Sequence, residues 1–533
     1  MSAIAHSSGS FAPLRMTSRG GSLFCAFLCF LWPFFPACSK REAAPTGQIL
    51  RISQRNEPAT LDPHLATLPD EFFIIRTLSE GLVTPNPDGG VPLPAMAERW
   101  ETSADSLIWT FHLRANAKWS NGDAVTAADF VFSIRRALTP AVAAPKASLF
   151  LAVKNAAAYY RGNLSDFTQV GLKSPDSRTL VITLERSAPD FLALVASGPW
   201  IPIHPSTVEK LGPVWTRSGN FVGNGPFVLT EWSPNQRIAV RKNPFYWDTA
   251  AVKLNRVNFL AFDSGDTEER AFRAGQLDVT MGVPTSKLDT YRTATPAVIH
   301  TVPLHETRYL ALNTTKPPLN DLRVRRALSL ALDRKILADQ VLKGGQQPAF
   351  TFVPPGLGGY APVAALKENT DEARRLLAEA GFAAGRNFPK LELSTWGASI
   401  TILEAIQQRW HEELGIEVAL VQREARTHLA ALAAGDFDLG FVTAIPDYDS
   451  PADLLDLLTS GHPGNYPHWR SAAYDRLVTG TSLPEAEKLL LDEMPVIPLY
   501  FNAKNFLLRP AVQGWREDAL WTRYYKNVSL HEN

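Results

Sequence analysis

The stretch WTFHLRANAKWSNGDAVTAADFVFSIRRAL, residues 109–138, decides the fold class of this chain. Its first part alternates apolar residues, such as Trp109 and Phe111, with polar ones, which is typical of a half-buried strand. The pair Asn121 and Gly122 then predicts a tight turn, because both residues tolerate the positive φ angles that such turns require.

The second part of this stretch predicts an amphipathic helix. Thr126 stands where an N-cap is expected, and Asp129 occupies the third helical position, as in a capping box. A strand, a turn and a helix in succession indicate an α/β protein. The apolar stripe expected to face the core consists of Phe130, Phe132, Ile134, Ala137 and Leu138.

Further helices and one internal repeat extend this α/β pattern. Residues 323–337 predict a long amphipathic helix, and residues 371–382 predict a helix that ends at Gly381. Residues 271–282 and 431–442 share Ala-x-x-Ala-Gly-x-x-Asp, which predicts a helix end, a glycine stop and a short strand in each. The repeat is either a chance similarity among α/β units or a sign of two related lobes that send strands toward a shared cleft.

Length and composition bound the class of protein. The chain has 533 residues, of which 45% are hydrophobic and 20% charged, so it can form two to four lobes with separate cores. Lys plus Arg equals Asp plus Glu at 53 each, so no net charge attracts nucleic acid or an anionic membrane. All three cysteines lie in the first 40 residues, which excludes disulfides and thiolate metal sites in the remaining body.

Residues 1–38 are typical of a signal peptide with a lipobox-like end. Arg15 precedes the apolar run 23–35, which is shorter than the roughly 20 residues of a membrane span. The sequence FPACSK around Cys38 resembles a bacterial lipobox and predicts lipid attachment at that thiol, with an ordinary cleaved signal as the alternative. Residues 39–48 would then form a short tether.

Motifs for covalent catalysis are missing from the sequence. It contains no G-x-S-x-G elbow, no phosphate-binding loop, no H-E-x-x-H and no glycine-rich dinucleotide turn. His411 with Glu412 and Glu413, and His462 with His468, are possible metal pairs, but their ordinary polar settings favour surface roles. We therefore predict no enzyme, no cofactor and no metal site. A hydrolase that uses two carboxylates placed by the fold is the alternative.

The segment FVTAIPDYDSPADLLDLL, residues 441–458, joins an apolar run to a helical pattern. Ser450 followed by Pro451 predicts an N-cap and a first helical position, and short acids nearby suit the helix dipole. Asp447 is either a turn or cap residue or a ligand carboxylate, and the two roles are compatible. Asp449 is expected to serve the cap.

Five blocks, in this order, carry a family resemblance. They are LDPHLATLPDEFFIIRTLSEGL, the stretch 109–138, GNGPFVLTEW with VRKNPFYW, LNDLRVRRALSLALDR, and DYDSP. Together they resemble the family 5 solute-binding proteins of bacterial ABC importers, which are periplasmic oligopeptide, dipeptide and nickel receptors. The resemblance implies the two-lobed type II periplasmic-binding-protein (Venus-flytrap) fold, α/β in class, with an additional domain inserted near the N-terminus. Its lobes close over a ligand by a hinge motion.

The resemblance also implies a division into domains and a function. Lobe one would comprise residues 49–85, 205–304 and 500–530. The inserted domain would comprise residues 86–204, and lobe two residues 305–499. The protein would be a monomeric lipoprotein of the periplasm or cell surface that captures oligopeptides and delivers them to an ABC transporter permease and ATPase. A receptor for another small solute or metal chelate, or a sensor without transport, is the alternative.

The resemblance implies that Asp447 pairs with the N-terminal ammonium of a bound peptide. A closing cleft strips water from that cation, so an opposed carboxylate is needed to make its burial tolerable. Glu71, in LPDEFF, is implied as a second ligand acid, with Asp70 in its place if the loop shifts by one residue; the alternative, slightly favoured, is an acid on the protein surface. The other residues expected to contact ligand are Ala444, Ile445, Tyr448 and Gly282.

Three departures from the oligopeptide receptors affect the expected cargo. Ala444 stands where those receptors usually have tryptophan, Phe441 where they have a basic residue, and Ala425 where they have an aromatic one. Loss of that charge and those rings should widen the pocket and weaken recognition of a peptide carboxylate. The cargo is therefore expected to be longer, capped or not a standard peptide.

Overall fold

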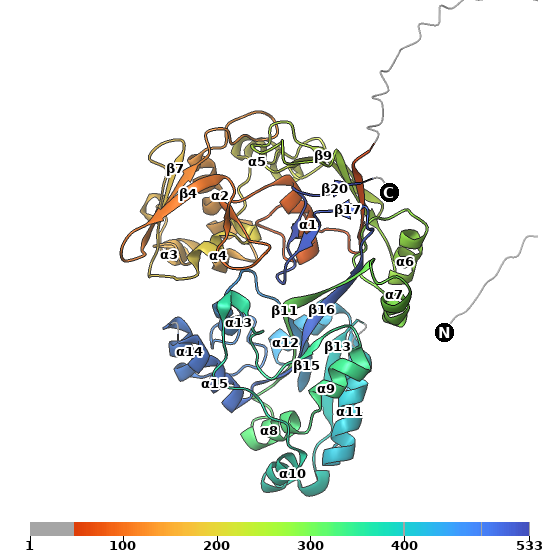
Figure 1. Cartoon of the computed structure of the whole chain (residues 1–533). Helices are drawn as coiled ribbons and strands as arrows, with labels where there is room; N and C mark the ends of the chain where they lie inside the picture. Colours follow the sequence, from red (N-terminus) through yellow and green to blue (C-terminus); the bar gives the residue numbers. More distant parts are fainter. Residues whose placement is uncertain (1–46, 398–399, 481, 532–533) are drawn as a thin grey trace, which may run out of the picture. The chain divides into compact units, whose positions relative to one another are not determined.

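The structure is a computed structural model that describes residues 47–397, 400–480 and 482–531. The predicted signal peptide, Cys38 and most of the predicted tether lie outside the described residues. Three main sheets, called A, B and C here, organise the described chain (Figure 1). Within the described ranges, no helix combines the length and apolar character that a membrane crossing requires.

Sheet A has four strands in the order β1-β10-β9-β8. The first pair is parallel and the other two are antiparallel, so the start of the chain lies beside a strand from its middle. The strands are β1 (Ile49–Gln54), β8 (Phe227–Ser233), β9 (Arg237–Lys242) and β10 (Arg256–Ala261).

Sheet B is antiparallel and has the order β4-β5-β7-β6. The predicted strand is β5 (Ile108–Leu113), and Gly122 in the predicted turn has φ +97°. One apolar cluster continues from sheet A into sheet B, so these two sheets share a core. The other strands of sheet B are β4 (Ala97–Thr102), β6 (Leu172–Lys173) and β7 (Thr179–Thr183).

Helix α2 (Ala127–Leu138) confirms the predicted capping box. The backbone N–H of Thr126 donates to Asp129 Oδ2 at 2.9 Å, which satisfies a donor that the first turn leaves free. Phe130 is buried in the core, as expected. Phe132 is only half-buried, because two residues along a helix rotate a side chain to a different face.

Sheet C is mixed, with the order β12-β16-β11-β15-β13-β14. Alternate residues of its strands enter separate apolar clusters on its two faces, as the period of two requires. In β11, for example, Leu310 packs with one cluster and Tyr309 with the other. The strands are β11 (Ile299–Leu312), β12 (Gln347–Pro348), β13 (Leu391–Trp396), β14 (Val418–Arg423), β15 (Leu439–Ala444) and β16 (Val496–Leu507).

Two long strands of sheet C, β11 and β16, pair antiparallel over much of their length. The register shifts between Pro303 and Thr307, and again between Arg308 and Tyr309. In Figure 1 both strands extend from sheet C toward the body formed by sheets A and B. The expected domain boundaries at 304/305 and 499/500 fall inside these strands.

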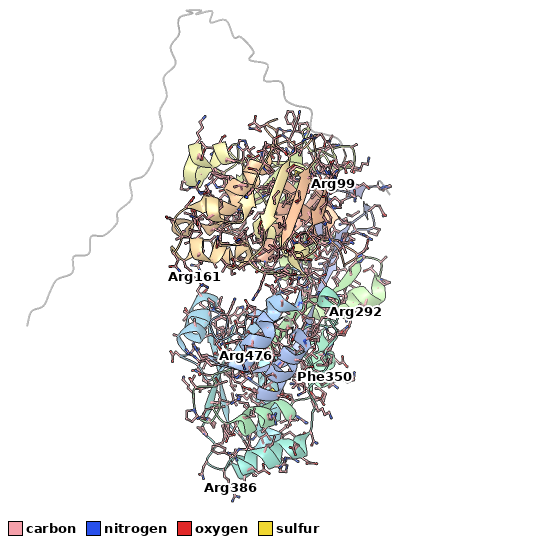
Figure 2. All side chains as sticks on the ribbon, turned by 90° about the vertical axis from the view of Figure 1, so that its left-hand side faces the viewer. Arg99, Arg161, Arg292, Phe350, Arg386 and Arg476 are labelled. Carbon is pink, nitrogen blue, oxygen red and sulfur yellow. The ribbon has the colours of Figure 1, made fainter. Side chains whose placement is uncertain are left out.

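The labelled arginines of Figure 2 lie on both bodies: Arg99 belongs to sheet B, and Arg386 and Arg476 belong to the body that contains sheet C. Three short two-stranded pairs complete the structure: β2 (Val83–Thr84) with β3 (Leu93–Pro94), β17 (Val512–Gln513) with β20 (Ser529–Leu530), and β18 (Arg516–Glu517) with β19 (Arg523–Tyr524). Besides α2, the α-helices are α1 (Pro69–Leu78), α3 (Ala156–Tyr160), α4 (Phe191–Val195), α5 (Pro205–Leu211), α6 (Gly265–Arg273), α7 (Leu288–Ala294), α8 (Leu322–Leu330), α9 (Arg334–Ile336), α10 (Thr370–Glu379), α11 (Ile400–Leu414), α12 (Ala425–Ala434), α13 (Pro451–Asp456), α14 (Ala472–Thr479) and α15 (Leu483–Glu493).

Two sequence expectations about helices need correction. The predicted helix 323–337 is broken after α8, because Asp333 accepts the N–H of Ile336 and starts α9 as its N-cap. The first copy of the internal repeat forms α6 and a glycine stop, but Val279 then makes only isolated bridges instead of a strand. The second copy forms α12, a glycine stop and β15 as predicted.

Candidate ligand-binding cavity

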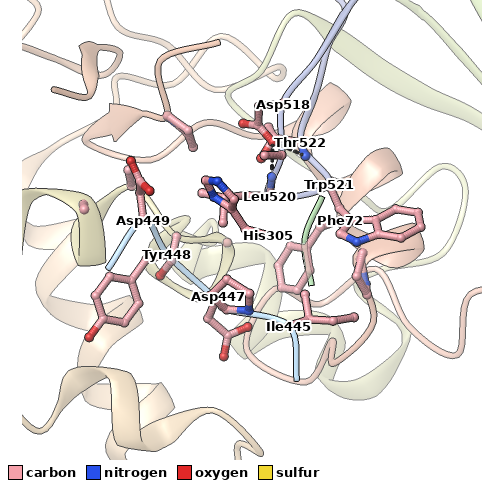
Figure 3. Close-up of a pocket in the computed structure, with 18 of the residues that line it drawn as sticks. Phe72, His305, Ile445, Asp447, Tyr448, Asp449, Asp518, Leu520, Trp521 and Thr522 are labelled. Carbon is pink, nitrogen blue, oxygen red and sulfur yellow. Dashed lines mark hydrogen bonds between the residues drawn. The ribbon is translucent and has the colours of Figure 1, made fainter. Parts of the chain in front are cut away.

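A cavity of about 590 Å³ lies between the body of sheets A and B and the loop that follows β15 in sheet C. In α/β sheets, ligands commonly bind beyond the carboxyl ends of strands, and this loop leaves such an end. Figure 3 shows the 445–449 loop and the 518–522 segment on different sides of His305. The walls are formed by residues 67–69, 72, 76, 85–90, 92, 146, 193, 196–199, 302, 303, 305, 445–449 and 517–522.

The 445–449 loop is positioned by the start of α13. Ser450 Oγ accepts the N–H of Ala452 at 3.1 Å, and Pro451 occupies the first helical position, as predicted. The same hydroxyl donates to Asp190 Oδ2 at 2.6 Å, and Asp190 directly precedes α4. Asp449 does not cap the helix as expected, because its Oδ1 accepts the N–H of Gly358 at 2.7 Å.

Asp447 lies in the cavity wall, and its carboxylate is already paired. Its Oδ1 is in direct contact with the ammonium of Lys146, which is 301 residues away in sequence. The Lys146 side chain is 20% exposed and that of Asp447 is 30% exposed, so both are partly shielded from water. The lysine ammonium also lies 5.9 Å from the centre of the Phe72 ring. The acid predicted to receive a ligand cation therefore has a cation of the protein beside it.

A second carboxylate stands behind this pair. Asp453, in the first turn of α13, accepts the backbone N–H of Asp447. Burial, and then the neighbouring charge of Asp447, raise the pKa of Asp453 well above its usual range. Burial therefore favours the neutral form of Asp453, which lies behind the ion pair of Asp447 and Lys146.

The neighbours of Asp447 supply apolar wall. Ile445 and Tyr448 line the cavity, as the sequence led us to expect. Tyr448 packs against the apolar cluster of sheets A and B although it follows a strand of sheet C. Burial, together with nearby acids including Asp453 and Asp190, raises the pKa of Tyr448 well above its usual value. Its hydroxyl therefore stays protonated.

The structure places Glu71 and Asp70 outside the cavity wall. The Glu71 carboxylate is 2% exposed and accepts the N–H groups of Ala59, Thr67 and Leu68 at 3.1, 2.8 and 3.0 Å. Asp70 accepts from the Asn56 side chain at 2.7 Å, and burial raises the pKa of Asp70. Both acids are thus engaged in holding the start of α1.

Ala444 and Gly282 also lie away from the cavity wall. Ala444 is 1% exposed and packs within a core cluster of sheet C. The N–H of Gly282 donates to Glu268 Oε1 at 3.3 Å, and a Cβ at this position would lie 2.7 Å from the Arg55 guanidinium. Phe441 is fully buried in the other cluster of sheet C.

Sequence reasoning missed the segment 517–522, which forms the opposite wall between β18 and β19. Glu517 is buried there with Arg523, at 2.8 Å, and in contact with Lys504. Asp518 accepts the N–H groups of Leu520 and Thr522 at 2.9 and 2.8 Å, which fixes the turn. No short motif in the sequence marks these residues as part of a site.

His305, in β11, completes the centre of the wall (Figure 3). Burial lowers the pKa of His305, so its ring is neutral at pH 7. Its buried Nδ1 has no hydrogen-bond partner among the described residues. Arg76, the other cationic group of the wall besides Lys146, donates to the carbonyl of Ala196 at 3.1 Å. The described residues contain no cluster of three potential metal ligands.

A family model described as bacterial extracellular solute-binding proteins, family 5 Middle, matches residues 91–466. The periplasmic murein peptide-binding protein MppA of Escherichia coli is 33% identical over 90% of this chain and 94% of its own length. A solved structure of that protein superimposes with a TM-score of 0.82 and covers 92% of this chain and 99% of the other.

Two further relatives are described with different kinds of ligand. A structure of Haemophilus influenzae OppA in complex with the peptide RPPGFSPFR is 30% identical, with a TM-score of 0.80, over 91% of this chain and 99% of the other. The probable deoxycholate-binding periplasmic protein YgiS of Escherichia coli is 34% identical over 88% of this chain and 90% of its length.

Proposed function

The chain belongs to the bacterial extracellular solute-binding proteins of family 5, and from this premise we propose that it is an extracytoplasmic peptide receptor of an ABC importer. It captures an oligopeptide by closure of its two lobes and delivers it to a permease and ATPase. The energy for closure comes from contacts that the ligand makes with both lobes at once. The protein carries out no covalent chemistry.

The observation that supports this function is the cavity at the junction of the two bodies. Its walls come from the start of α1 and the α4 segment on one side and from the 445–449 loop on the other. At about 590 Å³ it lies within the range of pockets that enclose small ligands. A short peptide segment fits this volume, and a longer peptide requires further opening.

We assign lobe one to residues 49–85, 205–304 and 500–530, the inserted domain to 86–204 and lobe two to 305–499. The strands β11 and β16 run across the two boundaries of lobe two, and the register shifts after Pro303 lie at the first of them. Strands that pass between lobes can act as a hinge by small changes in φ and ψ. The lipid anchor at Cys38 and the monomeric state belong to the same proposal.

Within the cavity we place the N-terminal end of the peptide at Asp447, with Ile445 and Tyr448 beside it. An ammonium group there would have to share the Asp447 carboxylate with Lys146, which contacts it. Glu71, Ala444 and Gly282 act through the elements they support, since none of them lines the cavity. The peptide backbone pairs with exposed strand or loop edges, which gives affinity without reading side chains.

Mass spectrometry of the small molecules that copurify with the folded protein tests this function. Peptides released on denaturation of the full chain, and absent from a matched preparation of the unfolded chain, are the expected result. Recovery of a single non-peptide solute would refute it.

A second candidate is a receptor for an apolar carboxylate, and one observation favours it. Lys146 offers a cation inside a largely apolar wall that includes Phe72, Ile445 and Trp521. One relative, YgiS of Escherichia coli, is named a probable deoxycholate-binding protein, which supports this candidate. The same mass spectrometry decides between the two candidates.

A further inference from the structure

The ion pair between Lys146 and Asp447 joins two parts of the molecule across the cavity. Lys146 directly precedes the short helix Ala147–Phe150 in the body of sheets A and B, and Asp447 follows β15 of sheet C. Both residues line the cavity. Any ligand group that approaches Asp447 in this arrangement therefore also meets the lysine ammonium.

Lys146 is held in place by its surroundings. Phe150, at the end of the same short helix, packs against Trp200 with ring centres 4.8 Å apart and against His64 at 6.4 Å. The lysine ammonium itself lies over the Phe72 ring. Because the backbone beside Lys146 is anchored by buried aromatic contacts, the cation is built into the wall.

Lys146 already supplies the Asp447 carboxylate with a counter-charge. The lysine ammonium contacts Asp447 Oδ1 directly, and burial raises the pKa of the Asp453 carboxyl behind the pair. An additional ammonium would place two cations beside one carboxylate in a site that is partly shielded from water. Like charges at such separations are unfavourable and suppress binding of the wrong partner. A neutral amide would instead accept a hydrogen bond from Lys146 and leave the pair intact.

We propose that Lys146 is a specificity-determining residue that selects peptides whose N-terminal end is uncharged, in particular N-acylated peptides. The apolar side chains of Phe72 and Ile445 line the cavity with the pair and suit an acyl group. The inference rests on the proposed peptide-binding function and on the peptide direction assigned there.

The test is a competition measured by native mass spectrometry. The full-length folded protein, freed of copurified ligand, is given equimolar libraries of tri- to pentapeptides with free and with N-acetylated termini. The readout is the ratio of acetylated to free peptides retained. Lys146→Met removes the charge, and Lys146→Arg keeps it. The matched control is Lys173→Met, which changes an exposed lysine of sheet B.

We expect the unmodified protein, Lys146→Arg and Lys173→Met to retain acetylated peptides preferentially. Lys146→Met should shift the retained ratio toward free amines by at least about tenfold, because Asp447 then lacks its cation. Thermal melts of each variant show that the fold is kept. If the unmodified protein prefers free amines, or if Lys146→Met leaves the ratio of acetylated to free peptides unchanged, the inference about Lys146 is wrong but the proposed function stands. Retention of no peptide by the unmodified protein would overturn the proposed function and the inference with it.

Discussion

His64 provides a prediction whose magnitude follows from its surroundings. The ring is 2% exposed, and Arg136 Nη1 donates to its Nδ1 at 2.9 Å while the same guanidinium pairs with Asp62 at 2.6 Å. Burial is the main cause that lowers the pKa of His64 to about 4 from 6.5. The folded state thus holds this histidine neutral, in contact with the Phe150 ring near Lys146.

The sign of the pH effect follows from this shift. The unfolded chain binds a proton at position 64 more readily than the folded one, so stability is full above pH 6.5 and falls as pH decreases toward 4. At 1.36 kcal/mol per pKa unit, the loss is about 2 kcal/mol at pH 5 and about 3 kcal/mol below pH 4.

Urea unfolding, followed by tryptophan fluorescence at pH 7.5 and pH 5, measures this loss. The matched variant is His64→Gln, whose carbonyl can accept from Arg136 but does not titrate, and His411→Gln changes a histidine that is 57% exposed. The unmodified protein and His411→Gln should lose about 2 kcal/mol more between the two pH values than His64→Gln does. Equal pH dependence of His64→Gln and the unmodified protein would refute the reasoning.

Three further predictions concern the cavity and its supports. Asp447→Asn should weaken binding of free-amine peptides by about 1.5–3 kcal/mol relative to N-acetylated ones, by calorimetry, because Lys146 loses its counter-charge; equal weakening of both would contradict this. Glu71→Gln should lower the free energy of unfolding by about 2–3 kcal/mol, through impaired acceptance of backbone N–H groups, without changing peptide affinity in the folded fraction; a large affinity change would place Glu71 on the ligand. Ser450→Ala should cost about 1 kcal/mol of stability and accelerate peptide release in stopped-flow measurements, since the α13 cap and the bond to Asp190 are both lost; unchanged release would argue against a role in closure.

Local sequence patterns predicted much of the fold. The capping box at Thr126 and Asp129, the turn at Gly122 and the Ser450-Pro451 helix start depend on neighbours within a few residues, and all are present. The break after α8 was missed because periodicity cannot show that Asp333 will cap a new helix.

Local sequence patterns predicted only part of the cavity wall. Asp447, Ile445 and Tyr448 were found because they share one short segment, DYDSP and the two residues before it, and DYDSP resembles a motif of a known family. Lys146 was missed because its partner is 301 residues distant, and only the folded chain brings the two together. For the same reason the sequence could not show that Glu71 is occupied by three backbone N–H groups.

The central claim is that the cavity beside the 445–449 loop holds the N-terminal end of a peptide. A crystal structure of the full chain with the peptide that the library competition selects tests this most directly. The claim predicts the first peptide residue within hydrogen-bond distance, about 3 Å, of Asp447 or Lys146. A peptide bound outside this cavity, or with its carboxyl end at Asp447, would contradict it.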